Sequence, residues 1–185
     1  GQFSRWLRLM ITLSLTALSR TKGPTQPGVL FLLDEFAALG HLRMAERGMA
    51  EGRGYGVRMW PILQDLNQLK DTYKDRWETF IGNARVVQFF GTADLFTAKY
   101  ASDLLGKTTV WSSGSSGERE STSETGRLLM TPDEVMHLGP DEELLFFRGG
   151  IRPIKARKVP YFASNLNELA DPNPMMAHGQ PGEAL

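Results

Sequence analysis

Two adjacent carboxylates close the most apolar stretch of the sequence. The run "VLFLL" (29–33) leads directly into Asp34 and Glu35, and such a run is typical of a strand buried on both faces of a parallel sheet. Open α/β sheets bind their ligands at the carboxyl ends of the strands. An aspartate there can hold Mg²⁺ through water, and the next glutamate can orient and deprotonate an attacking water. The alternative is a strand that ends at the surface with two solvated acids.

A glutamine and an arginine extend this candidate site. The stretch "GVRMWPILQ" (56–64) predicts a second strand ending at Gln64, although Pro61 marks a bulge or an edge position. In a parallel sheet Gln64 would share the edge with Asp34, where an amide can hydrogen-bond a γ-phosphate or the attacking water; otherwise it is an ordinary polar residue at a strand exit. Glycines flank Arg53 in "AEGRGYG" and expose it. It is either an arginine finger offered to a neighbouring subunit or a solvated surface arginine.

A Gly-Lys-Thr sequence further along the chain imitates a phosphate-binding loop. Such a loop follows a buried strand and opens a helix, so that backbone N–H groups and the positive end of the helix face the phosphates. In "ASDLLGKT" (101–108) the order is reversed, because an amphipathic helix leads into Gly106 and β-branched residues follow. We therefore predict that Gly106 ends a helix and that Lys107 holds no phosphate.

The elements that must position these side chains alternate between helix and strand. This alternation predicts βαβ units around a parallel sheet. Residues 112–126 ("SSGSSGERESTSETG") are expected to form a polar loop that packs no core, and Thr131 and Glu134 to form a capping box at the start of a helix. Helices are expected over 2–20, 41–53, 65–82 and 93–105, and strands over 29–33, 56–64, 84–90, 143–148 and 151–159.

Composition narrows the possible functions. The 185 residues favour one domain, and 21 basic residues balance 21 acidic ones, so no overall basic field indicates nucleic-acid binding. The absence of cysteine excludes disulfides, thiolate metal sites and cysteine nucleophiles, and the presence of only three, scattered histidines argues against a metal centre.

The apolar run at 9–18 is shorter than the roughly 20 residues of a membrane span. With no initiator methionine or signal-peptide pattern, the chain reads as a piece of a longer protein.

These stretches together resemble the C-terminal half of the motor domain of type IV secretion coupling proteins, the TraG-like conjugation ATPases. The resemblance runs from about residue 3 to 163 and rests on "FLLDEFAALGHL", "AEGRGYGV", "PILQDLNQLKDTY", "NARVVQFFGTADLFTAKYASDLLGKTTV" and "RLLMTPDEV". It implies that Asp34 and Glu35 form the Walker B motif, with Asp34 holding Mg²⁺ through water. It also implies catalytic roles for Glu35, Gln64 and, across subunits, Arg53. A further family stretch is matched by Asp94, Thr97, Ala98, Ser102, Gly106 and Thr108.

The resemblance implies an α/β fold: a RecA-like P-loop NTPase core with a mainly parallel sheet. Residues 1–163 would be the C-terminal part of the motor domain, and residues 164–185 a flexible tail. The Walker A half is expected upstream, before an inserted all-α domain. This piece alone is therefore not expected to bind ATP tightly or to hydrolyse it.

The same resemblance implies a function for the whole protein. It would use ATP and Mg²⁺ as a homo-hexamer on the cytoplasmic face of the bacterial inner membrane. It would pump single-stranded DNA bound to a relaxase, or effector proteins, into the channel of a type IV secretion system. The piece itself is expected to be soluble and cytoplasmic, with no membrane contact. Two alternatives stay open: a non-enzymatic docking platform for relaxosome or effector adaptors, and a motor of the FtsK/HerA type that pumps double-stranded DNA.

Two groups of basic residues are candidates for DNA contact. Arg43 and Arg47 share a helical face and could line a ring pore, but they could equally pair with Glu46 or Glu51. The stretch "RGGIRPIKARK" (148–158) alternates basic and apolar residues, as a half-exposed strand also does. Its basic residues are Arg148, Arg152, Lys155, Arg157 and Lys158.

Overall fold

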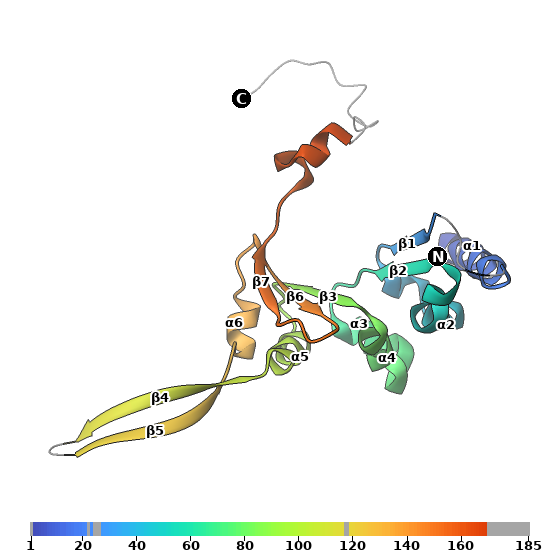
Figure 1. Cartoon of the computed structure of the whole chain (residues 1–185). Helices are drawn as coiled ribbons and strands as arrows, with labels where there is room; N and C mark the ends of the chain where they lie inside the picture. The colour runs from blue at the N-terminus through green and yellow to red at the C-terminus, as the bar shows by residue number, and fades with distance from the viewer. Residues whose placement is uncertain (1, 22, 24–26, 117–118, 170–185) are drawn as a thin grey trace.

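The computed structural model describes residues 2–21, 23, 27–116 and 119–169 (Figure 1). The helices are α1 (Gln2–Ser19), α2 (Arg43–Glu51), α3 (Leu66–Tyr73), α4 (Trp77–Asn83), α5 (Leu95–Leu105) and α6 (Pro132–Met136). The strands are β1 (Val29–Leu33), β2 (Val57–Pro61), β3 (Val86–Phe90), β4 (Lys107–Ser116), β5 (Arg119–Leu128), β6 (Glu142–Phe147) and β7 (Ile154–Arg157). Short 3₁₀ helices are η1 (Phe36–Leu39), η2 (Gly52–Tyr55), η3 (Lys74–Arg76), η4 (Tyr161–Ala163) and η5 (Asn165–Leu169).

Strands β1 and β2 form a parallel pair whose ladder continues past the strand ends. In this register Leu33 lies opposite Pro61, the last residue of β2. Beyond it, the Ile62 N–H donates to the Leu33 carbonyl (3.0 Å), and the Phe36 N–H donates to the Ile62 carbonyl (3.0 Å). These two hydrogen bonds join the segments that follow β1 and β2, just where they leave the sheet.

The other described sheets are antiparallel. Strand β6 lies between β3 and β7 and runs opposite to both. The connection between β6 and β7 covers only residues 148–153, whereas a parallel crossover needs about a dozen residues or more. Among the described strands, the expected parallel pairing is therefore found only between β1 and β2.

The main core lies on the helix side of the strands. It joins residues of β1, α3, α4, β3, α5, α6 and β6 into one buried cluster. An aromatic group stands at its centre: the ring of Tyr73 lies 4.4 Å from that of Phe80 and 5.9 Å from that of Phe36, measured between centroids. The Tyr73 hydroxyl also accepts the N–H of Leu42 (3.3 Å). Residues far apart in sequence thus meet in one core.

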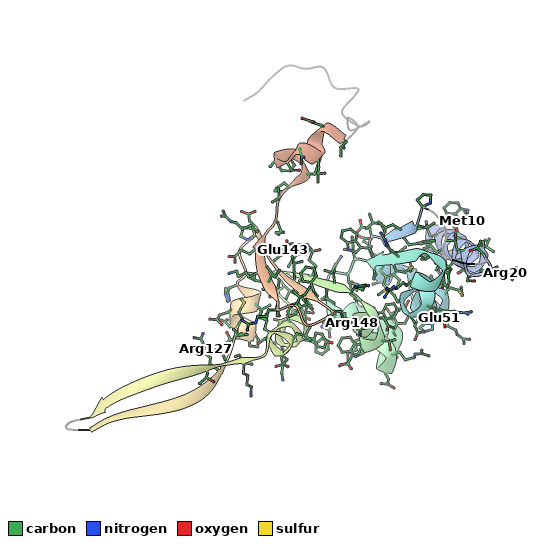
Figure 2. All side chains as sticks on the ribbon, in the orientation of Figure 1. Met10, Arg20, Glu51, Arg127, Glu143 and Arg148 are labelled. Carbon is green, nitrogen blue, oxygen red and sulfur yellow. The ribbon has the colours of Figure 1, made fainter. Side chains whose placement is uncertain are left out.

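Within the predicted loop at 112–126, residues 112–116 and 119–126 belong to strands. Strands β4 and β5 pair from Lys107 opposite Leu128 to Ser116 opposite Arg119, and Figure 1 shows the resulting ribbon projecting from the body. The loop prediction was wrong because it considered only core packing, whereas an antiparallel ladder pairs backbone groups without a core. Arg127 lies at the base of the ribbon (Figure 2). It forms an ion pair with Glu134 at 2.8 Å.

The predicted capping box is confirmed. The Thr131 hydroxyl accepts the Glu134 N–H, and the Glu134 carboxylate accepts the Thr131 N–H, which is the expected capping box. The proposed tail at 164–185 is described only to Leu169, which ends η5, and residues 170–185 lie outside the described residues. Within the described part of the chain, no helix combines the length and the hydropathy needed to cross a membrane.

Candidate functional site

The acidic pair and the glutamine leave the sheet at the same edge. Asp34 and Glu35 directly follow β1, and Gln64 follows β2 by three residues. Because β1 and β2 are parallel and in register, both carboxyl ends point the same way. All three residues are exposed. The structure therefore gathers the predicted acids and amide on one accessible edge.

The backbone at Glu35 is strained. Its φ of 48° and ψ of 47° are left-handed, and Glu35 and Lys74 are the non-glycine residues with positive φ in the described part of the chain. This conformation costs about 1–2 kcal/mol for an L-residue. It is held by the hydrogen bond from Phe36 to the Ile62 carbonyl and by burial of the Phe36 ring. Strain of this kind is concentrated at functional sites.

The carboxylates suit part of a magnesium–nucleotide site. One oxygen of Asp34, Oδ1, accepts the N–H of Glu35 at 3.0 Å. No group of three or more potential metal-ligating side chains occurs within the described residues. That does not argue against Mg²⁺, which is commonly bound through one or two carboxylates, water and substrate phosphates. No described strand leads through a glycine-rich loop into a helix, so the described residues fit the acidic side of such a site and include no phosphate cradle.

The Gly-Lys-Thr sequence is not such a cradle. Helix α5 ends at Leu105, and Gly106 follows it with a φ of 81°. Lys107 is then the first residue of β4. The prediction that Gly106 ends a helix is confirmed, and the helix does not begin where a phosphate would need it.

Arg53 lies at the other edge of the parallel pair. It is exposed in η2, which precedes β2, and the Gly56 carbonyl accepts the N–H of Val29, the first residue of β1. The length of β2, roughly 16 Å at 3.3 Å per residue, separates this edge from the acids. An arginine so placed is too far from its own Glu35 for direct contact. The structure does not bring Arg53 to the site of its own chain.

Several basic candidates for DNA contact are paired locally. Arg47 bonds Glu51 at 2.7 Å on α2, as the alternative interpretation allowed, and Lys155 bonds Glu142 at 2.8 Å between β7 and β6. Glu46 instead pairs with Arg76. Figure 2 shows Glu51 on α2 and Arg148 beside the β3–β6–β7 sheet. Arg43, Arg148 and Arg152 are exposed.

A partly buried polar network joins the first turn of α3, just after Gln64, to the start of α5, and sequence reasoning did not assign it a role. The Leu66 N–H donates to Thr97 Oγ1 (2.9 Å), and Asn67 Nδ2 donates to Asp94 Oδ1 (2.9 Å). Asp94 caps α5 by accepting the Thr97 N–H (2.8 Å). Hydrogen bonds, foremost that from the Thr97 hydroxyl, lower the pKa of Asp94 below its ordinary value. The available signal was the spacing of Asp94 and Thr97, which is that of a helix cap.

A separate hollow lies at the end of β3. Its volume is about 520 Å³, and the ammonium group of Lys158 lies 4.9 Å from the centroid of the Phe90 ring in its wall. Gly91, His137 and Leu138 also line it. Neither the acids nor Gln64 line this hollow, so we do not include it in the site.

Comparison with known sequences identifies the family of this chain. The family model described as "Type IV secretory system Conjugative DNA transfer" matches residues 3–183. The conjugal transfer protein TraG of Agrobacterium fabrum is 33% identical over 165 residues, which cover 84% of this chain and 25% of that protein. The protein VirD4 of Rhizobium radiobacter is 33% identical over 165 residues, covering 80% of this chain and 24% of that protein. The chain spans about a quarter of the length of these relatives.

Solved structures show the same fold. The bacterial conjugative coupling protein TrwB, in its unbound monoclinic form, superposes with a TM-score of 0.70 at 21% identity, over 81% of this chain and 36% of that one. TrwB in complex with ADP and Mg²⁺ gives a TM-score of 0.67 at 21% identity, over 84% of this chain and 37% of that one. The likeness confirms the predicted RecA-like α/β fold, of which this chain is a part.

Proposed function

This chain belongs to the family of type IV secretory system conjugative DNA transfer proteins, and from that premise we propose that it is the hydrolytic part of the motor domain of an ATP-driven coupling protein. One observation carries the proposal. A glutamate in a strained backbone conformation shares the carboxyl edge of a parallel strand pair with a strand-end glutamine. Open α/β sheets bind their ligands at this edge.

Each residue of the edge has a distinct task in this proposal. Glu35 accepts a proton from the attacking water, and Gln64 hydrogen-bonds that water or the terminal phosphate. Asp34 holds Mg²⁺ through a water molecule. A bound ion would neutralise negative charge on the phosphates. The phosphate-binding loop would belong to a segment outside the described residues.

The assembly and the cargo belong to the same proposal. The whole protein forms a homo-hexamer at the cytoplasmic face of the bacterial inner membrane. It moves single-stranded DNA with its relaxase, or effector proteins, into a type IV secretion channel. The names of the relatives support conjugative transfer, and the solved complex of TrwB with ADP and Mg²⁺ supports the choice of nucleotide and ion.

Replacing Glu35 by Gln in the full-length protein tests this proposal. We expect turnover of ATP to fall at least about 100-fold, because a general base contributes about 10²–10⁴-fold, while the dissociation constant for ATP changes little. ATP hydrolysis and nucleotide binding are measured side by side with Glu78→Gln, an exposed glutamate on α4, as the matched control. Unchanged turnover in Glu35→Gln would refute the assignment. DNA and relaxase binding by a wild-type protein without turnover would favour the docking platform instead.

Arg53 is tested by mixing subunits. Arg53→Ala and Gln64→Ala should each abolish hydrolysis in uniform hexamers. If Arg53 acts on the neighbouring subunit, mixed hexamers regain activity, because some interfaces then combine an intact Arg53 with an intact Gln64. Activity is measured across mixing ratios. Absence of rescue at every ratio would count against the intersubunit role.

A further inference from the structure

Gln64 occupies a short connection that is fixed to the first turn of α3. Its N–H donates to Oε1 of Gln68 (3.2 Å), and the Gln68 N–H donates to Oδ1 of the capping residue Asp65 (2.9 Å). The Gln64 side chain itself is exposed. The position of this side chain at the edge of the sheet therefore depends on where the first turn of α3 lies.

That first turn is fixed in turn to α5. The Leu66 N–H donates to Thr97 Oγ1 across 31 residues of sequence, and Asn67 Nδ2 donates to Asp94 Oδ1 across 27. Leu66 and Thr97 are both only 5% exposed. The first N–H groups of a helix lack partners within the helix. Here one of them is satisfied by a side chain of a neighbouring helix.

The Thr97 hydroxyl both accepts and donates a hydrogen bond. Its oxygen accepts the Leu66 N–H while its hydrogen is donated to Asp94 Oδ2 at 2.6 Å. Asp94 also accepts the backbone N–H of Thr97 through the same oxygen, and the Asn67 amide through the other. A valine has the same shape as threonine but would leave the buried Leu66 N–H without this acceptor, which is the costly case for a hydrogen bond. A serine would keep both bonds.

We propose that Thr97, together with Asp94 and Asn67, forms a positioning unit that holds Gln64 in place for hydrolysis. The inference rests on the proposed function, because it takes Gln64 as the residue that orients the attacking water. None of the three touches the reacting atoms. They act through the first turn of α3, and their contribution is geometric, since a misplaced group of this kind lowers the rate more than it lowers substrate affinity.

The chain offers a close control on the same helix. Ser102 is another buried hydroxyl of α5, with no exposed surface, and it donates to the Met130 carbonyl near the far end of the helix. Its hydrogen bond has no link to Gln64. Ser102→Ala therefore removes a buried hydrogen bond from α5 while leaving the α3 contact intact.

The experiment compares Thr97→Val, Thr97→Ser and Ser102→Ala in the full-length protein. We expect Thr97→Val to lower kcat for ATP about tenfold or more with KM changed less than about twofold, the pattern of a lost orientation effect. Thr97→Ser should behave like the parent protein. Hydrogen exchange followed by mass spectrometry should show faster exchange over residues 62–69 in Thr97→Val only. Melting temperatures are recorded for all variants.

Each outcome decides the question. The proposal is overturned if Ser102→Ala lowers kcat as much as Thr97→Val at an equal loss of melting temperature, because the effect would then be structural. It is also overturned if exchange over residues 62–69 is unchanged in Thr97→Val. A parent protein without turnover would instead refute the proposed function, and the exchange measurement would still show whether Thr97 fixes the Gln64 segment.

Discussion

The apolar side chains on the two faces of the strands differ strongly in solvent exposure. On the helix side, Leu33 of β1 and Leu144 of β6, which belong to separate sheets but to one core cluster, are 7% and 1% exposed. On the opposite side, Leu30, Leu32 and Trp60 are 55%, 58% and 52% exposed, although Leu32 and Trp60 lie opposite each other in the same parallel ladder. Strands β1 and β2 are thus covered on one side only by the described residues.

This difference in exposure indicates that the sequence of β1 is suited to burial on both faces, although the described residues cover only one. Parallel sheets are normally covered on both faces, and their strands are apolar throughout. The run "VLFLL" has this composition, and so it specifies burial of Leu30 and Leu32 as well as of Leu33. Since the chain spans about a quarter of its relatives' length, we expect the bare side to be covered within the full-length protein.

Truncating one leucine on each side should give the largest difference in the free energy of unfolding. In this 185-residue chain, Leu144→Ala is expected to lower the free energy of unfolding by about 2–5 kcal/mol, because it leaves a cavity in the core. Leu32→Ala should lower it by less than about 0.5 kcal/mol, as at other surface positions. Urea denaturation measures both. In the full-length protein the Leu32→Ala effect should grow. A Leu32→Ala effect equally small in both proteins would show that the bare side stays uncovered.

Tyr73 allows a finer test of the covered side. Tyr73→Phe keeps the ring stacking but removes the acceptor of the Leu42 N–H. We expect a loss of about 1 kcal/mol, the usual range for a buried hydrogen bond. Thermal or urea unfolding at neutral pH measures this loss. A loss near zero would indicate that the Leu42 N–H has another partner.

The same residue predicts a dependence on alkaline pH. Burial raises the pKa of Tyr73 above its ordinary value of 10.0, because the phenolate is disfavoured inside the protein. The folded state then holds the proton more tightly than the unfolded state does. The corresponding stabilisation is complete below pH 10 and is lost as the pH rises above it. The unfolding free energy of Tyr73→Phe should fall less steeply with pH in this range, and parallel curves would contradict the prediction.

Much of the fold and of the site follows from local sequence patterns. The apolar run and the acids after it predicted both β1 and the edge that Asp34 and Glu35 share with Gln64, because these depend on strand direction alone. The end of α5 at Gly106 followed from the order of helix and glycine. In each case the local sequence was sufficient to predict the structure.

Features set by distant contacts or by backbone pairing could not be predicted in this way. The predicted helix over 65–82 is divided at Lys74, whose φ is 49°, although no glycine or proline marks the break. The β4–β5 ribbon has no apolar periodicity, and the β3–β6 pairing depends on chain reversal through distant elements. The bond between Leu66 and Thr97 requires α3 and α5 to meet.

The smallest expected effect on stability concerns an ion pair outside both sides of the strands. Arg47 and Glu51 are about half exposed, and a hydrogen bond to Glu51 raises the pKa of Arg47 above its ordinary value. Because exposed pairs contribute little, Arg47→Gln should leave the unfolding free energy unchanged within error. If Arg47 also lines a DNA path, the variant should weaken binding of single-stranded DNA by the full-length protein and reduce its salt dependence, whereas Glu51→Gln should not weaken it. Unchanged DNA affinity in Arg47→Gln would leave this arginine as half of a local ion pair and Arg43 as the remaining basic candidate on α2.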